Sequence, residues 1–269
     1  EFYPEYKPTN CHTMTGEQLK SIKKEVDIKN ISCFDNNEYL KKINNVINAG
    51  FYYPTTSSFF IFKNSTFNNQ KMVMYCEIQA SNHNINNKIN DYNVVNNNTF
   101  PNLPEIFHEH IDACLCIEPT IIYFFSGKYY IRYNLVQQNA YGDKPRLISK
   151  NFKGLPPNFY SNLSSTVYKG NNMVYFVKNN IYIEFDISKI NTKQNISAVH
   201  NISELITNDL TEKDQTKLIN LSTIDTIISY YDSNDKLIDL YLFSKTMYSN
   251  IQYIDDSKEI KIESKKNYE

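Results

Sequence analysis

The sequence predicts an all-β protein in which four copies of one strand unit form a radial array. The main observation is an internal repeat without a gap: Phe100 recurs as Phe152 and Tyr123 recurs as Tyr175, both at an offset of 52 residues. A fixed offset of that length is typical of architectures with one supersecondary unit per repeat. The second observation is that each copy consists of short β-prone runs that turn residues separate.

The clearest copy shows its strands through alternation and breakers. Residues 111–117 form a first strand, which Glu118 and Pro119 end, and residues 121–125 are a β-branched and aromatic second strand. A Ser-Gly turn then leads to a third strand over residues 129–133. Residues 146–152 are expected to form either a short helical turn or a fourth strand.

Two degraded copies flank the clear ones, so that the unit starts are Asn48, Asp112, Ser164 and Asp225, spaced by 64, 52 and 61 residues. The strands expected in these outer copies are residues 59–64, 71–75, 240–243 and 251–255. An Asn-rich insertion near residues 81–98 lengthens one loop of the first copy. Four units of three or four strands each predict blades that bury their faces against their neighbours.

Composition limits the class of protein. The chain has 269 residues, 41% of them hydrophobic, and a formal net charge of −1. This is enough apolar material for a sizeable core, and near-zero charge argues against a nucleic-acid partner. No apolar run is long enough to span a bilayer. The absence of Trp and the excess of Asn, Lys, Ile and Tyr indicate an AT-rich genome.

The cysteines number five and form no Cys-x-x-Cys pair, which leaves a zinc knuckle or a thioredoxin-like site without support. Cys114 and Cys116 would share a face of one strand and are predicted to be buried thiols. Cys11 and Cys33 could pair in an oxidising compartment, and the state of Cys76 stays open.

Residues 1–46 differ from the rest and are expected to form an N-terminal extension of one or two helices. A capping box over residues 15–18 precedes Leu19, Ile22 and Val26 at helical spacing. The first residues do not resemble a signal peptide. We expect an extracellular or cell-surface protein whose signal is not part of this sequence. N-glycosylation triplets support this only weakly in so Asn-rich a chain; they begin at Asn30, Asn64, Asn97, Asn162, Asn195, Asn201 and Asn220.

The repeat resembles the hemopexin-like domain, a four-bladed β-propeller. The resemblance lies in Ile-Asp-Ala at 111–113, Tyr-Phe-Phe-Ser-Gly at 123–127 and Phe-Lys-Gly-Leu-Pro at 152–156. It implies a propeller over residues 47–269, with blades at about 47–110, 111–162, 163–223 and 224–269. The chain departs from the family in having Ile131 and Ile183 where Trp is usual, and in having no Cys in its last unit to join the first and last blades.

The resemblance also implies an ion in the central channel, held by main-chain carbonyls at the start of each inner strand. The matching positions are Asn48, Asp112, Ser164 and Asp225. A hard cation such as Ca²⁺ or Na⁺ accepts such oxygens. Because carbonyl oxygens coordinate the ion, serine at position 164 in place of the usual Asp need not abolish the site.

His108-Glu109-His110 is the densest histidine cluster. On a strand, the rings of His108 and His110 would share a face and could bind a transition metal or haem. The triplet falls in a connection between blades, and the next copy has Tyr160 and Asn162 at these positions. A solvated linker is therefore the favoured interpretation, and haem is not expected.

No motif recommends catalysis, because the chain lacks His-Glu-x-x-His, a Gly-x-Ser-x-Gly elbow and a phosphate-binding loop. The leading hypothesis is a non-catalytic, secreted or surface-exposed recognition module that binds a protein or glycan through propeller loops. Specificity is expected in the Asn-rich insertion and the N-terminal extension. The alternatives are a haem or metal-ion carrier that uses His108 and His110, and an assembly subunit of a pathogen toxin or invasion complex.

Overall fold

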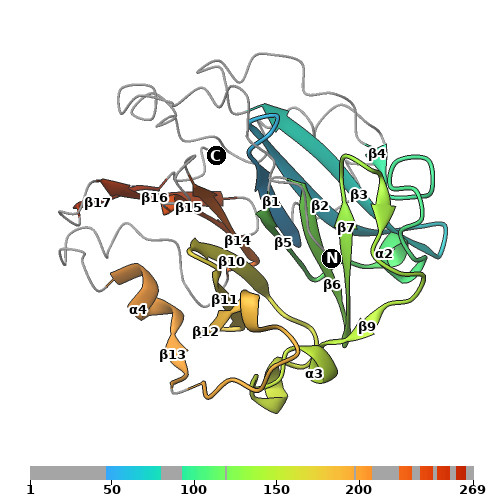
Figure 1. The fold of residues 1–269 in the computed structure, drawn as a ribbon. Helices are drawn as coiled ribbons and strands as arrows, with labels where there is room; N and C mark the ends of the chain where they lie inside the picture. Colours follow the sequence, from blue (N-terminus) through green and yellow to red (C-terminus); the bar gives the residue numbers. More distant parts are fainter. Residues whose placement is uncertain are drawn as a thin grey trace.

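The computed structural model describes residues 47–79, 93–118, 120–196, 198–207, 224–231, 237–244, 247–254 and 259–264. The predicted N-terminal extension, Cys11, Cys33 and most of the Asn-rich insertion lie outside these ranges. Within them the chain is all-β: four antiparallel sheets account for the strands, and the helices are short (Figure 1). The predicted fold class is confirmed at this level.

The first sheet has the strand order β1-β2-β3-β4. Its strands are β1 (Ala49–Tyr53), β2 (Ser58–Phe67), β3 (Gln70–Gln79) and β4 (Asn93–Val94). The β2–β3 hairpin is longer than predicted, with ten residues in each strand. The reason is that pairing continues past Asn64 to a turn at Asn68 and Asn69, whose φ angles of 48° and 63° suit that side chain.

The second sheet contains the predicted strands with small shifts at their ends. Its elements are β5 (Ala113–Glu118), β6 (Ile121–Ser126), β7 (Tyr129–Asn134), β8 (Asn139–Ala140) and β9 (Arg146–Leu147). Both β8 and β9 pair with the outer edge of β7. The two alternatives weighed for residues 146–152 both occur, because β9 leads directly into the helical turn α3 (Ile148–Asn151). Another helical turn, α2 (Ile106–Glu109), precedes the sheet.

The third and fourth sheets repeat this arrangement. The third consists of β10 (Ser165–Gly170), β11 (Met173–Lys178), β12 (Ile181–Asp186) and β13 (His200–Asn201), with η3 (Pro157–Phe159), η4 (Ile187–Lys189) and α4 (Ile202–Thr207) around it. The fourth consists of β14 (Thr226–Tyr231), β15 (Leu237–Ser244), β16 (Met247–Ile254) and β17 (Glu259–Ser264). The hairpin turns at Gly127 and Asn179 occupy the same repeat position, and both have left-handed φ values of 54°.

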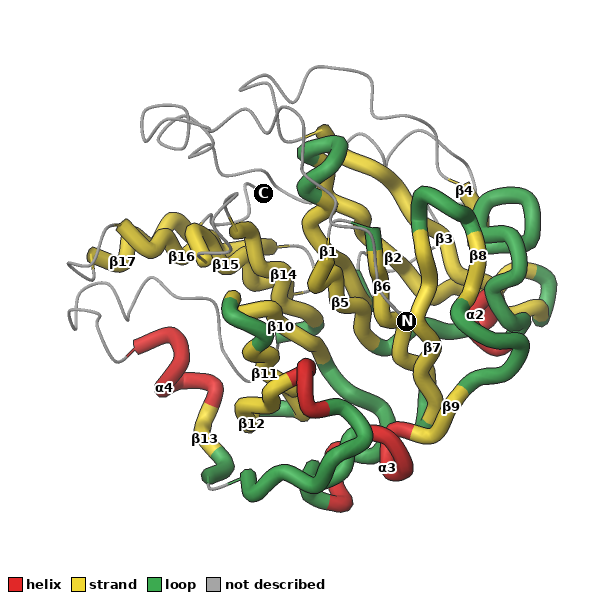
Figure 2. The backbone as a smooth tube through the Cα atoms, viewed as in Figure 1, coloured by secondary structure: helices red, strands yellow, loops and turns green. Residues whose placement is uncertain are grey.

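The first strands of the four sheets lie together in the middle of the molecule, and the later strands lie progressively further out (Figures 1 and 2). Strand β1 contacts β5 and β14, and β10 also contacts β5 and β14. Each first strand is therefore covered by two others, which explains why β1 and β14 are buried at every position.

Aromatic and aliphatic side chains fill the spaces between successive sheets. Between the first and second sheets, Phe62 and Phe124 meet edge to face with ring centroids 5.6 Å apart. Between the second and third, Phe125 meets Phe176 in the same way at 5.8 Å. Such pairs add about 0.5–1.5 kcal/mol each beyond the area they bury. Aliphatic residues including Ile227 and Leu242 fill the space between the third and fourth sheets.

The positions where the resembled family usually carries Trp are filled by smaller residues. Ile131 is 1% exposed and Ile183 is fully buried, so both isoleucines belong to the core. The buried side chains of Phe100 and Phe152 add aromatic volume to the same two clusters. Phenylalanine and tyrosine thus build the core of a chain that has no Trp.

Candidate functional site

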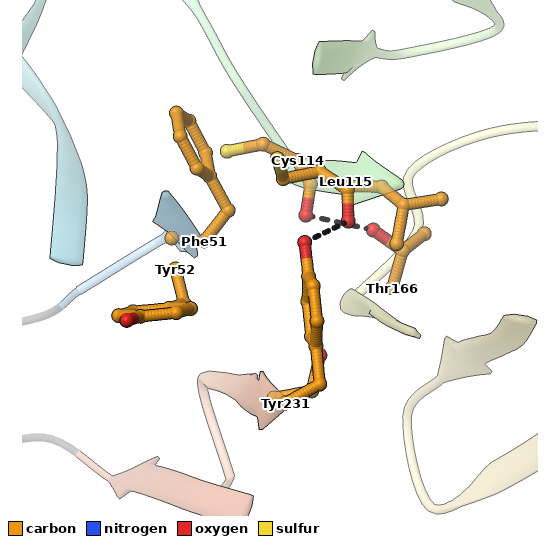
Figure 3. Close-up of a pocket in the computed structure, with 9 residues that line it drawn as sticks. Phe51, Tyr52, Cys114, Leu115, Thr166 and Tyr231 are labelled. Carbon is orange, nitrogen blue, oxygen red and sulfur yellow. Dashed lines mark hydrogen bonds between the residues drawn. The ribbon is translucent and has the colours of Figure 1, made fainter. Parts of the chain in front are cut away.

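A small cavity lies where the four first strands meet (Figure 3). Its lining consists of residues 50–52 of β1, residues 114–116 of β5, Thr166 of β10, and Ser229 and Tyr231 of β14. The cavity measures about 10 Å³, which is close to the room that one water molecule requires. Every sheet contributes to this lining through its first strand.

Hydroxyl groups from two sheets bond to main-chain carbonyls of a third at this cavity. Thr166 Oγ1 donates to the carbonyl oxygen of Cys114 at 2.9 Å, and Tyr231 Oη donates to that of Cys116 at 3.2 Å (Figure 3). Both contacts are buried. Since a buried carbonyl without a partner is costly, these hydroxyls replace the strand partner that β5 lacks on this edge.

A second set of polar contacts joins β10 to β14. Ser165 Oγ lies 2.9 Å from the carbonyl oxygen of Ile227 and 3.0 Å from its amide nitrogen, which donates to the hydroxyl. Further along, Ser229 Oγ accepts a hydrogen bond from the amide of Tyr168 at 3.1 Å. The inner strands therefore carry serine and threonine where a purely apolar core would leave main-chain groups unsatisfied.

The four residues predicted to hold a channel ion occupy equivalent places in the four sheets. Each directly precedes the first strand of its sheet, and its amide donates to a carbonyl of the second strand. The bonds run from Asn48 to Phe62 at 3.0 Å, from Asp112 to Phe125 at 2.8 Å, from Ser164 to Val177 at 2.9 Å and from Asp225 to Phe243 at 2.8 Å. The alignment of the degraded outer copies with the clear ones thus agrees with the register of the strands.

The side chains of three of these residues bond to the neighbouring hairpin. Asn48 Oδ1 accepts a hydrogen bond from the amide of Asn64 at 2.8 Å, and Asp112 Oδ2 accepts one from the amide of Gly127 at 2.6 Å. Ser164 Oγ accepts one from the amide of Asn179 at 2.8 Å. The hydroxyl at position 164 therefore makes the bond that the carboxylate makes at position 112. These side chains join the start of each of these three first strands to the adjacent hairpin.

His108 and His110 have different surroundings. His108 is half-buried on α2, and burial lowers the pKa of its imidazole despite the opposing effect of Glu105 and of a hydrogen bond to the Leu103 backbone. His110 follows the helix in extended conformation, and its Nε2 lies 2.8 Å from Asp112 Oδ1. The two rings therefore do not lie side by side on a strand. Within the described residues, no three His, Cys, Asp or Glu side chains are grouped to hold a metal.

Cys76, Cys114 and Cys116 are buried thiols, as predicted for the last two. Burial raises the pKa of the Cys114 thiol well above its usual value. A thiol with a raised pKa is a poor nucleophile at neutral pH. Cys114 and Cys116 therefore line the cavity as small core residues, whereas Cys76 is buried on β3.

Sequence reasoning missed the hydroxyl residues of the inner strands and the role of Asn64. The side chain of Asn64 bonds both main-chain groups of Ile111, accepting from its amide and donating to its carbonyl at 2.9 Å, and so joins the first sheet to the approach of the second. The available signal was that Thr166 and Ser229 are hydroxyl residues next to the apolar residues Val167 and Ile228 in predicted inner strands.

No protein-family model matches the chain, and no curated protein matches it in sequence. The structure is similar to a 2S albumin seed protein from Dolichos (TM-score 0.58, 18% identity, 82% of this chain and 92% of that chain). It is also similar to the hemopexin fold protein CP4 from cow pea (0.58, 18%, 81% and 93%). A plant lectin with two metal binding sites from Cicer arietinum gives a TM-score of 0.55 at 16% identity, covering 80% of this chain and 92% of that chain.

At these identities the likeness concerns the fold alone. It agrees with the hemopexin-type architecture that the repeat predicts, while membership of the hemopexin-like family stays a prediction. As regards membranes, the described part of the chain contains no helix with the length and apolar character needed to cross one.

Proposed function

We propose that this protein is a non-catalytic recognition module, secreted or exposed at a cell surface, whose four sheets are the blades of a closed propeller. The observation that carries the proposal is the set of contacts among the first strands: β1 and β10 each contact β5 and β14. Such an arrangement commits the inner strands to structure and leaves the outer loops free to vary. In this proposal the blade boundaries lie near residues 110, 162 and 223.

The partner is a protein or a glycan that the loops bind. Two features support this: the inner cavity has room for about one water molecule, and its thiols and hydroxyls are buried or engaged with main-chain groups. The similarity to a plant lectin agrees with a binding function and does not identify the ligand. No nucleic-acid or membrane-spanning role is part of the proposal.

The channel ion belongs to the same proposal. Ca²⁺ or Na⁺ would be coordinated by the main-chain carbonyls of Asn48, Asp112, Ser164 and Asp225, the residues that directly precede the four first strands. We expect Ca²⁺ to raise the melting temperature of metal-stripped protein, with Na⁺ and Mg²⁺ as comparisons. An unchanged melting temperature with all three ions would remove the ion from the proposal.

Haem carriage is left out of the proposal because His110 is paired with Asp112 and His108 is half-buried on a different element. Titration with haem, followed in the Soret region, tests this exclusion. A shift that disappears in a His108→Ala/His110→Ala variant would restore the carrier hypothesis. Assembly within a pathogen toxin or invasion complex remains the second protein-binding candidate, and chains that co-purify with the native protein distinguish it.

The recognition proposal is tested by capture. The immobilised protein is exposed to extracellular and cell-surface fractions and to a glycan array, and bound proteins are identified by mass spectrometry. A matched variant replaces residues 80–92 with a short Gly-Ser linker, and its melting temperature is measured first. We expect saturable capture by the parent and weaker capture by the variant. Absence of saturable capture from every source would contradict the proposal.

A further inference from the structure

The two arginines of the chain occur together on one face of the second sheet. The sequence has 28 Lys and Arg residues, of which only Arg132 and Arg146 are arginine. On β7, Arg132 is directly opposite Tyr123 of β6, and Tyr130 is directly opposite Arg146 of β9. Since residues two apart on a strand share a face, Tyr130 and Arg132 bring both arginines to the same side.

The guanidinium of Arg132 lies close to two aromatic rings. Its guanidinium carbon lies 5.6 Å from the ring centroid of Tyr123 and 4.7 Å from that of Tyr141. Tyr141 is fixed there because its amide donates to the carbonyl oxygen of Arg132 at 2.9 Å. Two stacked rings orient a guanidinium without using its N–H donors.

Arg132 has a hydrogen-bond donor that the described residues leave unsatisfied. Its Nε is buried and has no hydrogen-bond partner within the described ranges, and no carboxylate of those ranges forms an ion pair with it. A buried donor without a partner costs about 1–3 kcal/mol, and such a group often marks a missing water or ion. An oriented cation with an unsatisfied donor is suited to bind an anion.

Arg146 lies beside the same short segment. It is solvent-exposed, and an ideal Cβ placed on Gly142 would be 3.8 Å from its Nη2. Its positive charge near the hydroxyl of Tyr130 partly offsets the rise in the pKa of Tyr130 that burial causes. The two guanidinium groups thus flank the Tyr141–Gly142 segment, and Lys144 adds an exposed positive charge nearby while Asp143 adds a negative one.

We propose that Arg132 and Arg146 bind the sulfate or carboxylate group of an acidic glycan, with the half-exposed ring of Tyr141 against the sugar. Arginine suits this ligand because its planar fork donates two parallel hydrogen bonds to such oxygens, which a lysine cannot do. The preference for a sugar-borne monoanion over a phosphate rests on the tyrosine-rich surroundings. This inference depends on the proposed recognition function and specifies its ligand class.

The test is a titration of the full chain with a heparin-derived tetrasaccharide, with the same tetrasaccharide after desulfation and N-acetylation, with an oligogalacturonate and with a phosphopeptide. We expect Arg132→Lys and Arg146→Lys each to weaken binding of a sulfated or carboxylated oligosaccharide by about tenfold or more, because each variant retains the charge and loses the fork. The control Lys144→Gln, which loses a charge in the same loop, should remain within about threefold. Melting temperatures of all variants verify folding, and the exposed Arg146 tests the inference even if Arg132→Lys unfolds.

Three results would overturn the inference: no binding of any of the acidic oligosaccharides, equal weakening in all three variants, or a preference for the phosphopeptide. Its failure can be separated from failure of the recognition proposal. If both arginine variants still capture the partner that the parent captures, the recognition function stands and the arginine site does not. If the parent binds neither a captured partner nor any acidic oligosaccharide, the recognition function and the arginine site both fail.

Discussion

His108 is placed so that its neutral form is favoured in the folded protein. The residue is half-buried on α2, its Nε2 is buried without a partner within the described part of the chain, and desolvation lowers the pKa of the ring. A proton on this ring would add charge where solvent cannot reach it. The histidine is thus a structural residue in the native state at neutral pH.

This placement predicts a pH dependence of stability. Because the pKa of His108 is lower in the folded than in the unfolded state, the unfolded chain binds the proton first as the pH falls. The free energy of unfolding should therefore decrease below about pH 6.5, the usual histidine pKa, down to the lowered folded value. Urea unfolding at pH values from 7.5 to 5 measures the free energy of unfolding. In the His108→Gln variant this free energy should depend less on pH. An equal slope in parent and variant would contradict the assignment.

At the scale of the elements, the central strands of the second and third sheets could be predicted because alternation, β-branched residues and turn residues agree there. The first sheet was harder to predict, since Asn64 looks like the end of a strand but lies within β2. Helix α2 spans four residues, too few for helical periodicity to be visible. Thr166 occupies the repeat position of Cys114 and bonds its carbonyl, a relation that only the arrangement of strands reveals.

Two tyrosines allow the junction between β5 and β14 to be tested. Tyr231 Oη donates to the carbonyl oxygen of Cys116, whereas Tyr133 Oη is buried without a partner in the described segments, and burial raises the pKa of Tyr133 to about 12. Tyr231→Phe should cost about 1 kcal/mol because a buried carbonyl loses its donor. Tyr133→Phe is the matched control and should be neutral or slightly stabilising. The denaturant midpoints of the two variants are compared with that of the parent. Equal decreases in both variants would mean that the hydrogen bond of Tyr231 does not contribute to stability.

At the scale of the whole molecule, the repeat predicts that the chain returns to its beginning. The first and last sheets must then stabilise each other without the disulfide that the resembled family often uses, because residues 224–269 contain no Cys. In the structure this junction is aromatic and closely packed: the ring centroids of Tyr52 and Tyr230 are 4.5 Å apart, and those of Phe59 and Tyr241 are 5.1 Å apart. The first and last sheets therefore pack directly against each other through β1 and β14.

The contact between the first and last sheets can be tested quantitatively at Gly50. A Cβ at position 50 would lie 2.3 Å from Ile228 Cδ1 and 2.9 Å from the carbonyl oxygen of Phe60, so that the close approach of β14 to β1 requires glycine. Gly50→Ala should lower the free energy of unfolding by about 1–3 kcal/mol because the added methyl group overpacks the site. Ile228→Ala should lower it by about 2–5 kcal/mol because it leaves a cavity. In the double variant the new methyl group occupies part of that cavity. The double variant should therefore lose less free energy of unfolding than the two single variants together, by about 1 kcal/mol or more. Urea unfolding of all four proteins measures this coupling. Strictly additive losses would mean that the first and last sheets do not meet at these residues, and the closed ring would have to be abandoned.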